Sequence, residues 1–148
     1  MYLHSRDPPI IHRDIKPENI LLDKNNNVKL AGKPLLKVDF GWSNFLNKPR
    51  KTYCGTFDYL APEMIDKSGH DEKLDIWCLG VLAYELLTGK TPFVSQGPKQ
   101  EARDEVKKRI EKNILDVNIN FPNDFPIMAK GFILGMIKRI PEERLTLK

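Results

Sequence analysis

The segment from Leu74 to Leu87 is the strongest helical pattern in the chain, with apolar residues at most of its positions. Wound at 3.6 residues per turn, it presents apolar side chains on nearly every face, and a helix of that kind is normally buried. Gly89 follows closely, at a place where helices commonly end because glycine adopts a left-handed conformation without strain. The pattern therefore predicts a buried central helix.

Weaker patterns predict two further helices. An amphipathic helix is expected from about Lys99 to Asn113, where basic and acidic residues interleave as on a solvated helix face. Another is expected after Pro126, where apolar residues recur up to Ile137. Together with the central helix, these segments predict a helical bundle.

Short apolar segments on both sides of an Asn-rich turn predict a small β-hairpin. Residues 20–22 and 28–30 flank the turn at 25–27. Residues 40–62 contain repeated Gly and Pro and are expected to form a loop, and residues 1–5 resemble the last turn of a helix that begins earlier. The predicted fold is mostly α, a bundle around one buried helix with a hairpin at its edge.

Composition narrows the classes of function only slightly. The chain has 148 residues, the length of one domain, and its 24 Lys and Arg against 20 Asp and Glu give a net charge of +4. This excess is too small to indicate nucleic-acid binding. No stretch approaches the length of a membrane helix, and no signal peptide opens the chain. We therefore expect a soluble, intracellular protein without a membrane or a direct nucleic-acid partner.

The two cysteines, Cys54 and Cys78, match neither a metal site nor a secreted disulfide pattern. Cys78 lies inside the apolar run of the central helix. It is expected to be a buried thiol.

Three short motifs carry the candidate chemistry. HRDIKPEN at 12–19 is followed by DFG at 39–41 and by APE at 61–63. Each motif is weak alone, but the order matches the motif set of protein kinases, and it disfavours the alternative of a coincidental acidic loop. The chain resembles the larger, mostly helical lobe of a eukaryotic serine/threonine protein kinase, a fragment of an α+β fold with the small hairpin at its catalytic edge.

This resemblance implies roles in phosphate transfer from ATP. Asp14 is expected to be the catalytic base that accepts or orients the proton of the substrate hydroxyl. Lys16 is expected to steady the transferring phosphate, and its place two residues after the Asp is the serine/threonine-kinase form. Asn19 and Asp39 are expected to bind Mg²⁺, since their oxygens are hard donors suited to a hard cation.

The resemblance also assigns neighbours to the nucleotide site. Glu18 and Leu21 are expected beside the bound ATP, although a structural salt bridge is an equal alternative for Glu18. His12 is interpreted as a packed core histidine near Phe40 and not as a proton carrier.

Two structural supports are expected around this site. Asp75 would be costly to bury unpaired, and the resemblance assigns it hydrogen bonds from the backbone of the loop at 12–14. Glu63 and Arg144 resemble the ion pair that ties the end of the activation segment to the helical base.

Longer motifs narrow the family to one that resembles the Aurora kinases. DFGWS at 39–43, CGTFDYLAPEM at 54–64 and HDEKLDIW at 70–77 carry this resemblance, and the Trp-Ser after DFG is its most selective feature. The resemblance extends from His12 to Arg144. A different serine/threonine kinase with a convergent Trp-Ser is the alternative.

The Aurora resemblance implies partners and a cellular setting. The expected substrates are proteins with basic residues around the target Ser or Thr, and a regulatory activator protein is a possible further partner. The expected setting is the cell cycle, in the cytoplasm or nucleus, on the spindle or chromosomes.

Thr52 aligns with the activation-loop threonine of these kinases. A phosphate there would add about −1.5 to −2 charge, which Arg13 and Arg50 could pair; a surface threonine in a flexible loop is the alternative. Lys51 stands where a second threonine is common, which puts dual phosphorylation in doubt. Thr56 resembles the threonine that bonds the catalytic Asp and Lys.

By the same resemblance, residues 1–148 correspond to a partial kinase domain, from the end of helix E to around helix H. The small lobe, with its Gly-rich loop and strand lysine, is expected to be missing and the last helix to be truncated. Activity of the chain alone is therefore not expected.

Seven extra residues interrupt the match. Deleting residues 32–38 leaves NVKLADFGWS, a continuous strand and metal loop, so we interpret the segment as a retained short intron or a gene-model artefact. A genuine insertion could displace Asp39. Sequencing that finds these codons in every mature transcript would exclude the artefact.

The leading function is thus a serine/threonine kinase that uses Mg-ATP. The alternatives are a non-catalytic kinase lobe that binds substrates or competes with an intact kinase, and a gene fragment that folds poorly.

Overall fold

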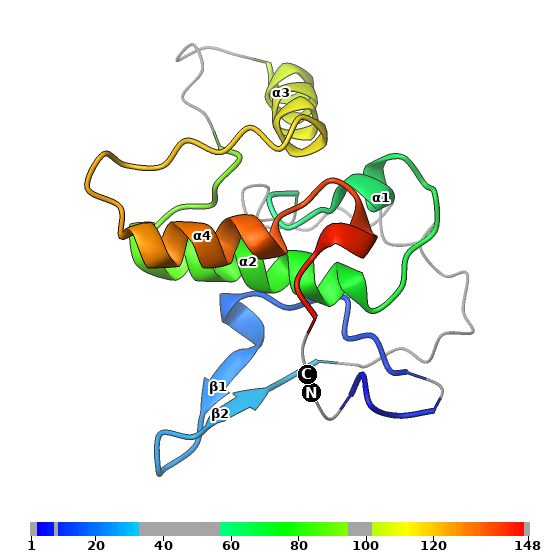
Figure 1. The fold of residues 1–148 in the computed structure, drawn as a ribbon, viewed down its shortest axis with the longest axis vertical. Helices are drawn as coiled ribbons and strands as arrows, with labels where there is room; N and C mark the ends of the chain where they lie inside the picture. The colour runs from blue at the N-terminus through cyan, green and yellow to red at the C-terminus, as the bar shows by residue number, and fades with distance from the viewer. Residues whose placement is uncertain (1–2, 8, 33–56, 95–101, 147–148) are drawn as a thin grey trace.

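The computed structural model describes residues 3–7, 9–32, 57–94 and 102–146. In these ranges the chain is mostly helical with one small antiparallel sheet (Figure 1). The elements, in chain order, are the 3-10 helix η1 (Pro17–Asn19), strands β1 (Ile20–Leu22) and β2 (Val28–Leu30), helices α1 (Pro62–Ile65), α2 (Lys73–Thr88), α3 (Arg103–Leu115) and α4 (Ile127–Met136), and the 3-10 helix η3 (Pro141–Glu143). This architecture confirms the predicted helical bundle with a hairpin at its edge.

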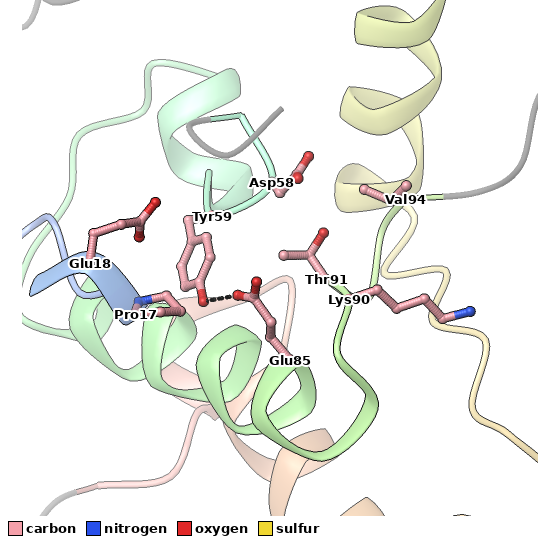
Figure 2. Close-up of a pocket in the computed structure, with 8 residues that line it drawn as sticks. All are labelled: Pro17, Glu18, Asp58, Tyr59, Glu85, Lys90, Thr91 and Val94. Carbon is pink, nitrogen blue, oxygen red and sulfur yellow. Dashed lines mark hydrogen bonds between the residues drawn. The ribbon is translucent and has the colours of Figure 1, made fainter. Parts of the chain in front are cut away.

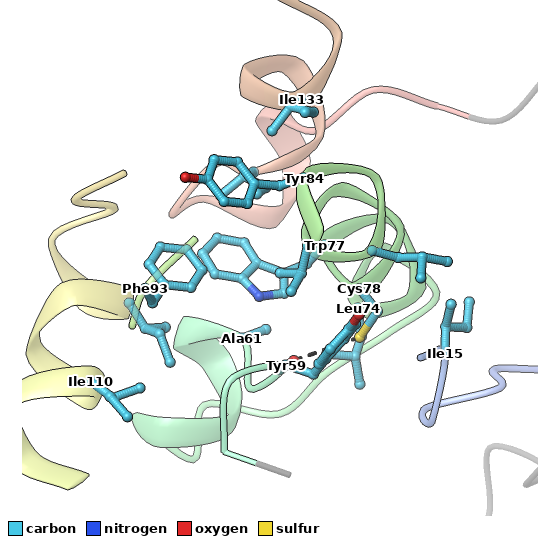
Figure 3. Close-up of a cluster of buried hydrophobic side chains, with 14 of the residues drawn as sticks. Ile15, Tyr59, Ala61, Leu74, Trp77, Cys78, Tyr84, Phe93, Ile110 and Ile133 are labelled. Atoms are coloured by element: carbon cyan, nitrogen blue, oxygen red, sulfur yellow. Dashed lines mark hydrogen bonds between the residues drawn. The ribbon is translucent and has the colours of Figure 1, made fainter. Parts of the chain in front are cut away.

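Helix α2 is the centre of the core. Trp77 is fully buried and stacks on Phe93, with the ring centroids 5.4 Å apart (Figure 3). The helix ends at Gly89, which has a φ of 74° and donates its amide to the carbonyl of Glu85 at 2.8 Å. Cys78 is buried, and its thiol contacts the Tyr59 carbonyl at 3.7 Å. The predicted central helix and the buried thiol are both confirmed.

Helix α4 packs along α2 (Figure 1). Gly80 makes the close approach possible: a Cβ at this position would lie 2.6 Å from Cγ1 of Ile137 and 3.1 Å from Cβ of Met136. Ile133, Met136 and Ile137 are buried in this contact region. A small residue in the middle of α2 therefore sets the spacing of the two helices.

The neighbouring ends of these helices are exposed. Leu86 and Leu87 in the last turn of α2, and Ile127 and Met128 at the start of α4, are between 56% and 86% exposed, and Phe132 further along α4 is 57% exposed. Burial along the whole of the central helix was therefore a wrong expectation for its last turn, because the described elements enclose only the turns before it.

Helix α3 begins at Arg103, four residues after the predicted start, and residues 95–101 lie outside the described part of the chain. Ile110 and Ile114 turn its apolar side inward. The connection from α3 to α4 is fixed by Tyr84, whose hydroxyl donates to the Asn120 carbonyl at 2.7 Å. The rings of Tyr84, Phe121 and Phe125 pack together in the same region, with centroids 4.9–5.9 Å apart.

The predicted hairpin is present, and its strands pair with Leu22 opposite Val28 and Ile20 opposite Leu30. Asp23 shapes the turn, since its Oδ1 accepts the amides of Asn25 and Asn27, each at 2.9 Å. These bonds, led by that from the Asn27 amide, hold the pKa of Asp23 below its ordinary value. The hairpin projects from the helical body (Figure 1).

The predicted loop at 40–62 is described from residue 57 onward, and it leads into the single turn α1, which the sequence reading did not anticipate. Pro62 occupies the first helical position, where its missing N–H costs nothing. None of the helices in the described ranges has both the length and the apolar character needed to cross a membrane.

Candidate active site

Three of the residues predicted to take part in phosphate transfer lie in contact with one another in the loop before the hairpin. The ammonium of Lys16 lies 2.8 Å from Oδ1 of Asp14. The side-chain amide of Asn19 donates to Oδ2 of Asp14 at 2.8 Å and to its backbone carbonyl at 2.6 Å. These contacts orient the Asp14 carboxylate, and its side chain remains 46% exposed and therefore accessible to a ligand.

The backbone of η1 builds this arrangement. The Asn19 amide donates to the Lys16 carbonyl at 3.0 Å, and Pro17 starts the turn. The Asn19 carbonyl in turn accepts the amide of Ala31, next to β2, at 2.7 Å. The turn and the hairpin therefore hold Lys16 and Asn19 in contact with the two oxygens of the Asp14 carboxylate.

Asp75 of α2 anchors the loop from inside. Its side chain is fully buried, and its two oxygens accept the amides of His12 at 2.9 Å and Arg13 at 2.8 Å. These are the hydrogen bonds expected from the sequence. Arg13 has a φ of 66°, which is uncommon for a residue with a side chain, and the two bonds hold it in that conformation.

His4 is a third partner of Asp75 that the sequence reading missed. Its Nε2 lies 2.8 Å from Oδ2 of Asp75, and its side chain is 10% exposed. A histidine near the start of the chain carries no motif. The contact spans 71 residues, so the tertiary structure was needed to reveal it.

His12 is 4% exposed, as expected for a packed histidine. Its Nε2 lies 3.0 Å from the Ala31 carbonyl. Gly32 follows with a φ of 139°, and a Cβ there would be 2.7 Å from the same nitrogen. Phe40, the expected neighbour of His12, lies outside the described residues.

The guanidinium of Arg13 is partly enclosed, and its Nε and Nη1 atoms have no hydrogen-bond partner among the described residues. Burial lowers the pKa of Arg13, and the nearby charge of Asp75 opposes this shift. A desolvated cation with open donor positions favours binding of an anion.

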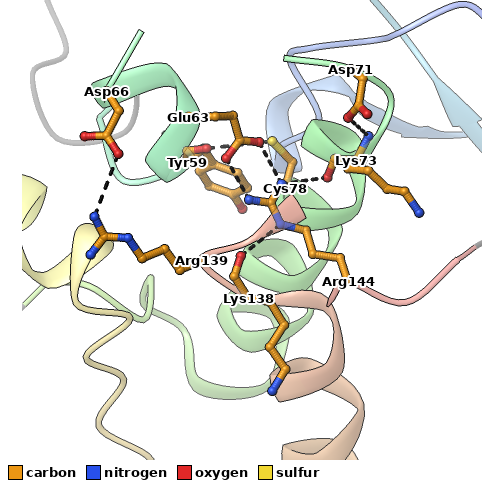
Figure 4. A network of polar contacts seen from close by, with 9 residues as sticks. All are labelled: Tyr59, Glu63, Asp66, Asp71, Lys73, Cys78, Lys138, Arg139 and Arg144. Carbon is orange, nitrogen blue, oxygen red and sulfur yellow. Dashed lines mark hydrogen bonds and ion pairs between the residues drawn. The ribbon is translucent and has the colours of Figure 1, made fainter. Parts of the chain in front are cut away.

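The predicted ion pair between Glu63 and Arg144 is present and bidentate. Both N–O distances are 2.7 Å, and the Arg144 side chain is fully buried (Figure 4). Arg144 also donates to the carbonyls of Lys73 and Lys138 and lies over the ring of Trp77. One side chain thus joins α1, α2 and the segment that follows α4.

An acidic pocket of about 360 Å³ lies beside the loop (Figure 2). The Tyr59 hydroxyl donates to Oε2 of Glu85 at 2.5 Å within it. The sequence reading missed this pocket, although Glu85 breaks the apolar pattern of α2 and was the available signal. The lining residues are Pro17, Glu18, Asp58, Tyr59, Glu85, Lys90, Thr91 and Val94.

Of the carboxylates that line this pocket, Glu18 was the subject of an expectation from the sequence and Asp58 was not. Glu18 forms no ion pair with any described residue, so the structural salt bridge considered for it is not seen in this part of the chain. Burial is the main cause that raises the pKa of Asp58 to about 6, and the charge of Glu85 adds to it while a hydrogen bond from Thr91 opposes it. Burial also raises the pKa of Tyr59, which therefore stays a neutral donor to Glu85.

Leu21, expected beside the nucleotide, is 54% exposed on the hairpin. Other predicted positions lie outside the described residues, namely Asp39, Phe40, Arg50, Lys51, Thr52, Cys54, Thr56 and residues 33–38.

The described residues fit part of a magnesium site. Asn19 uses its amide nitrogen toward Asp14, which leaves its side-chain oxygen for a cation, and the Asp14 carboxylate is adjacent. Both are hard oxygen donors, as Mg²⁺ prefers. Within the described ranges there is no cluster of three or more His, Cys, Asp or Glu suited to a metal, so a complete site needs a further ligand such as the expected Asp39.

Comparison with known proteins adds an independent observation. The family model for the protein kinase domain matches residues 1–148. The chain is 44% identical to an Aurora kinase of Patiria pectinifera over 147 residues, and 44% identical to an Aurora kinase of Saccharomyces cerevisiae and to Aurora kinase C of Mus musculus over 149 residues. These matches take in 99% of this chain but 32%, 35% and 47% of the three relatives, so the chain spans about a third to a half of their length.

Proposed function

Since this chain belongs to the protein kinase domain family, we propose that it supplies the catalytic loop of an Aurora-like serine/threonine protein kinase. Residues 1–148 correspond in this proposal to a part of the large lobe, from the end of helix E to around helix H. The observation that carries the proposal is the convergence of Asp14, Lys16 and Asn19 within 2.8 Å, on a loop anchored by Asp75.

The proposed reaction transfers the γ-phosphoryl group of ATP to a protein hydroxyl. Asp14 orients the hydroxyl and accepts its proton, and the hydrogen bond from Asn19 holds the carboxylate in place. Lys16 balances charge on the transferring group from its position against Asp14. Mg²⁺, when bound through Asn19 and Asp39, neutralises charge on the phosphates.

The acidic pocket supports the proposed preference for substrates with basic residues. Glu18 and Glu85 both line it, and the Tyr59 hydroxyl holds one oxygen of Glu85. A carboxylate fixed in this way can pair with a Lys or Arg side chain without first losing much conformational freedom. A peptide bound with a basic residue there passes close to the catalytic loop, because Pro17 and Glu18 belong to both features.

Phosphorylation of Thr52 is proposed as the activating event. Arg13 supports it, since two nitrogens of its guanidinium are buried without a partner among the described residues. A phosphate on Thr52 would satisfy these donors and order the loop near Asp14. Removing it with a phosphatase should lower kcat, and an Arg13→Ala variant should lose this response.

The kinase proposal is tested in the full-length protein with Asp14→Asn. This change removes the proton acceptor and should reduce ATP-dependent phosphorylation of a basic Ser/Thr peptide by roughly 10²–10⁴-fold, with the fold unchanged by circular dichroism. Asp124→Asn, at an exposed position away from the loop, is the matched control and should keep full activity. Undiminished turnover by the Asp14 variant would refute the assignment.

A non-catalytic interaction module is the second candidate, favoured by the exposed apolar ends of α2 and α4. Leu86, Ile127 and Met128 are each more than 70% exposed, and contiguous exposed apolar surface marks interaction sites. Binding of a protein partner without Mg-ATP turnover by the full-length protein would favour this function over the first.

The proposed setting is the cell cycle, with a regulatory activator protein and with a location on the spindle or chromosomes. Similarity to Aurora kinases supports it. Imaging of the tagged full-length protein through mitosis tests it, and a distribution that ignores these structures would count against it.

A further inference from the structure

His4 is a partner of Asp75 to which the proposed function gives no role. Its Nε2 lies 2.8 Å from Oδ2 of Asp75, and the side chains of His4 and Asp75 are 10% and 0% exposed. A turn fixes the position of this ring, because the Leu3 carbonyl accepts the amides of Arg6 at 3.4 Å and Ile10 at 3.0 Å. The imidazole therefore reaches the inside of the catalytic loop from a separate segment of the chain.

The hydrogen bonds of the Asp75 carboxylate are of two kinds. Those from the amides of His12 and Arg13 come from the loop that the carboxylate positions. The bond with His4 comes from outside that loop, and it shares Oδ2 with the His12 amide. A carboxylate bonded only to the groups that it positions would be free to rotate together with them. A bond from a third segment fixes the orientation of the carboxylate itself.

Arg13 is the residue for which this orientation matters most. Its φ of 66° is uncommon for a residue with a side chain, and the bond from its amide to Oδ1 of Asp75, at 2.8 Å, holds it there. Rotation of the carboxylate would lengthen that bond and let Arg13 relax toward a negative φ. Asp14 is the next residue, so its carboxylate would then move relative to Lys16 and Asn19. A displacement of about 1 Å in a catalytic group can cost about a hundredfold in rate.

We infer that His4 is a positioning residue for phosphate transfer: its Nε2–H donates to Asp75 and thereby keeps Arg13 and Asp14 in the conformation that catalysis requires. The donor is Nε2, so the ring carries a proton on this nitrogen, because a carboxylate can only accept. This inference rests on the proposed kinase function, which places the reaction at Asp14. It differs from a space-filling role for His4, in which the ring matters and its hydrogen bond does not.

The first test measures the kinetics of variants of the full-length protein. His4→Phe keeps an aromatic ring but removes the donor. It should lower kcat about tenfold, while the KM values for ATP and for a basic Ser/Thr peptide change by less than about twofold. His4→Gln places an amide N–H donor near the position of Nε2 and should restore kcat to within about threefold of the wild type. Tyr84→Phe is the matched control, since it removes the 2.7 Å bond from α2 to the Asn120 carbonyl, away from the loop, and should keep the wild-type kcat.

The second test follows the loop without using activity. Hydrogen exchange of the amides of His12 and Arg13 reports how firmly Asp75 holds them. His4→Phe should speed this exchange, whereas His4→Gln and Tyr84→Phe should leave it at the wild-type rate. An equal loss of kcat in His4→Phe and His4→Gln would overturn the inference, because it would show that the shape of the ring and not its hydrogen bond is required.

The two measurements separate this inference from the proposed function. If the wild-type protein shows no ATP-dependent turnover but exchange responds to His4→Phe, the kinase proposal fails and the ordering of the loop by His4 stands. If the wild-type protein turns over and His4→Phe changes neither kcat nor exchange, the role of His4 alone is refuted. The wild-type protein gives a result even if the variants do not fold. Nitrogen-15 spectra of the His4 ring should show a proton on Nε2, and a ring protonated at Nδ1 alone would overturn the inference, because it cannot donate to Asp75.

Discussion

At the residue scale, the buried carboxylate of Asp75 predicts part of the tertiary structure, because a buried charge needs polar partners. Asp75 stands in the first turn of an otherwise apolar helix, and the cost of burying it unpaired predicted partners in the loop at 12–14. The structure provides the amides of His12 and Arg13, and it adds the ring of His4. One carboxylate therefore orders the backbone from which Asp14 projects.

Asp58 gives a stability prediction with a defined sign. Its pKa is about 6 in the fold against an ordinary value of 3.8, so between these values the folded chain binds more protons than the unfolded chain. Asp58 therefore lowers the free energy of unfolding progressively as the pH rises from about 4 to 6. Above about pH 6 this loss of stability is complete.

Asp58→Asn removes this penalty while keeping an oxygen that can accept from Thr91. It should raise the free energy of unfolding by about 1–2 kcal/mol at pH 7.5, allowing for partial solvent screening, and by little at pH 4. Urea unfolding at both pH values measures the difference. An equal gain in the free energy of unfolding at both pH values would show that ionisation of Asp58 does not destabilise the fold.

At the element scale, the contacts that α2 makes with α4 and with α1 each depend on one residue. Gly80 lets α4 approach, and Arg144 joins the segment after α4 to α1 and α2. Neither role follows from the pattern of apolar residues. That pattern indicates which face of a helix is buried, but it does not indicate which other element packs against that face.

Gly80→Ala tests the close packing of α2 on α4. The new methyl would lie 2.6 Å from Cγ1 of Ile137, so the helices must separate, and the free energy of unfolding should fall by about 1–3 kcal/mol despite the better helix propensity of Ala. Gly131→Ala on α4 is the matched control, since its Cβ would meet no atom within 4 Å. It should instead stabilise the chain by about 0.5–1 kcal/mol. Equal effects of the two changes would contradict the packing argument.

Glu63→Ala tests the buried ion pair. It leaves the Arg144 guanidinium buried without its carboxylate and should lower the free energy of unfolding by about 3–5 kcal/mol. Asp66→Ala is the comparison, because it breaks a 3.9 Å pair between Asp66 and Arg139 that is about half exposed. Its cost should stay below about 1 kcal/mol. Thermal unfolding of both variants gives the ranking, and a reversed order would show that the buried pair does not stabilise the fold.

At the scale of the whole molecule, the exposed ends of α2 and α4 bear on how the chain behaves in solution. Ile127 and Met128 are 85% and 86% exposed and lie at the end of α4 that adjoins the last turn of α2 (Figure 1). An apolar patch of this kind favours association.

We expect the 148-residue chain to associate with itself as its concentration rises. Replacing Ile127 and Met128 by Lys should weaken this association without loss of stability, because both side chains are already exposed. Sedimentation velocity over a concentration series measures the effect. The pair Asn118→Lys and Asn123→Lys adds the same charge elsewhere on the surface and should leave association in place. A chain that stays monomeric at every concentration would contradict the prediction.

The sequence by itself determined the identity of the central helix, the presence of the hairpin and the spacing of Asp14, Lys16 and Asn19. Local rules decide these features: side-chain periodicity, turn residues and motif spacing all act over a few neighbouring positions. The tertiary structure alone decided that His4 meets Asp75, that the last turn of α2 is exposed, and that Glu18, Asp58 and Glu85 line one pocket. The bond between Tyr59 and Glu85 in this pocket joins residues 26 positions apart, and that between His4 and Asp75 joins residues 71 positions apart. A pattern of neighbouring residues contains no information on such pairs.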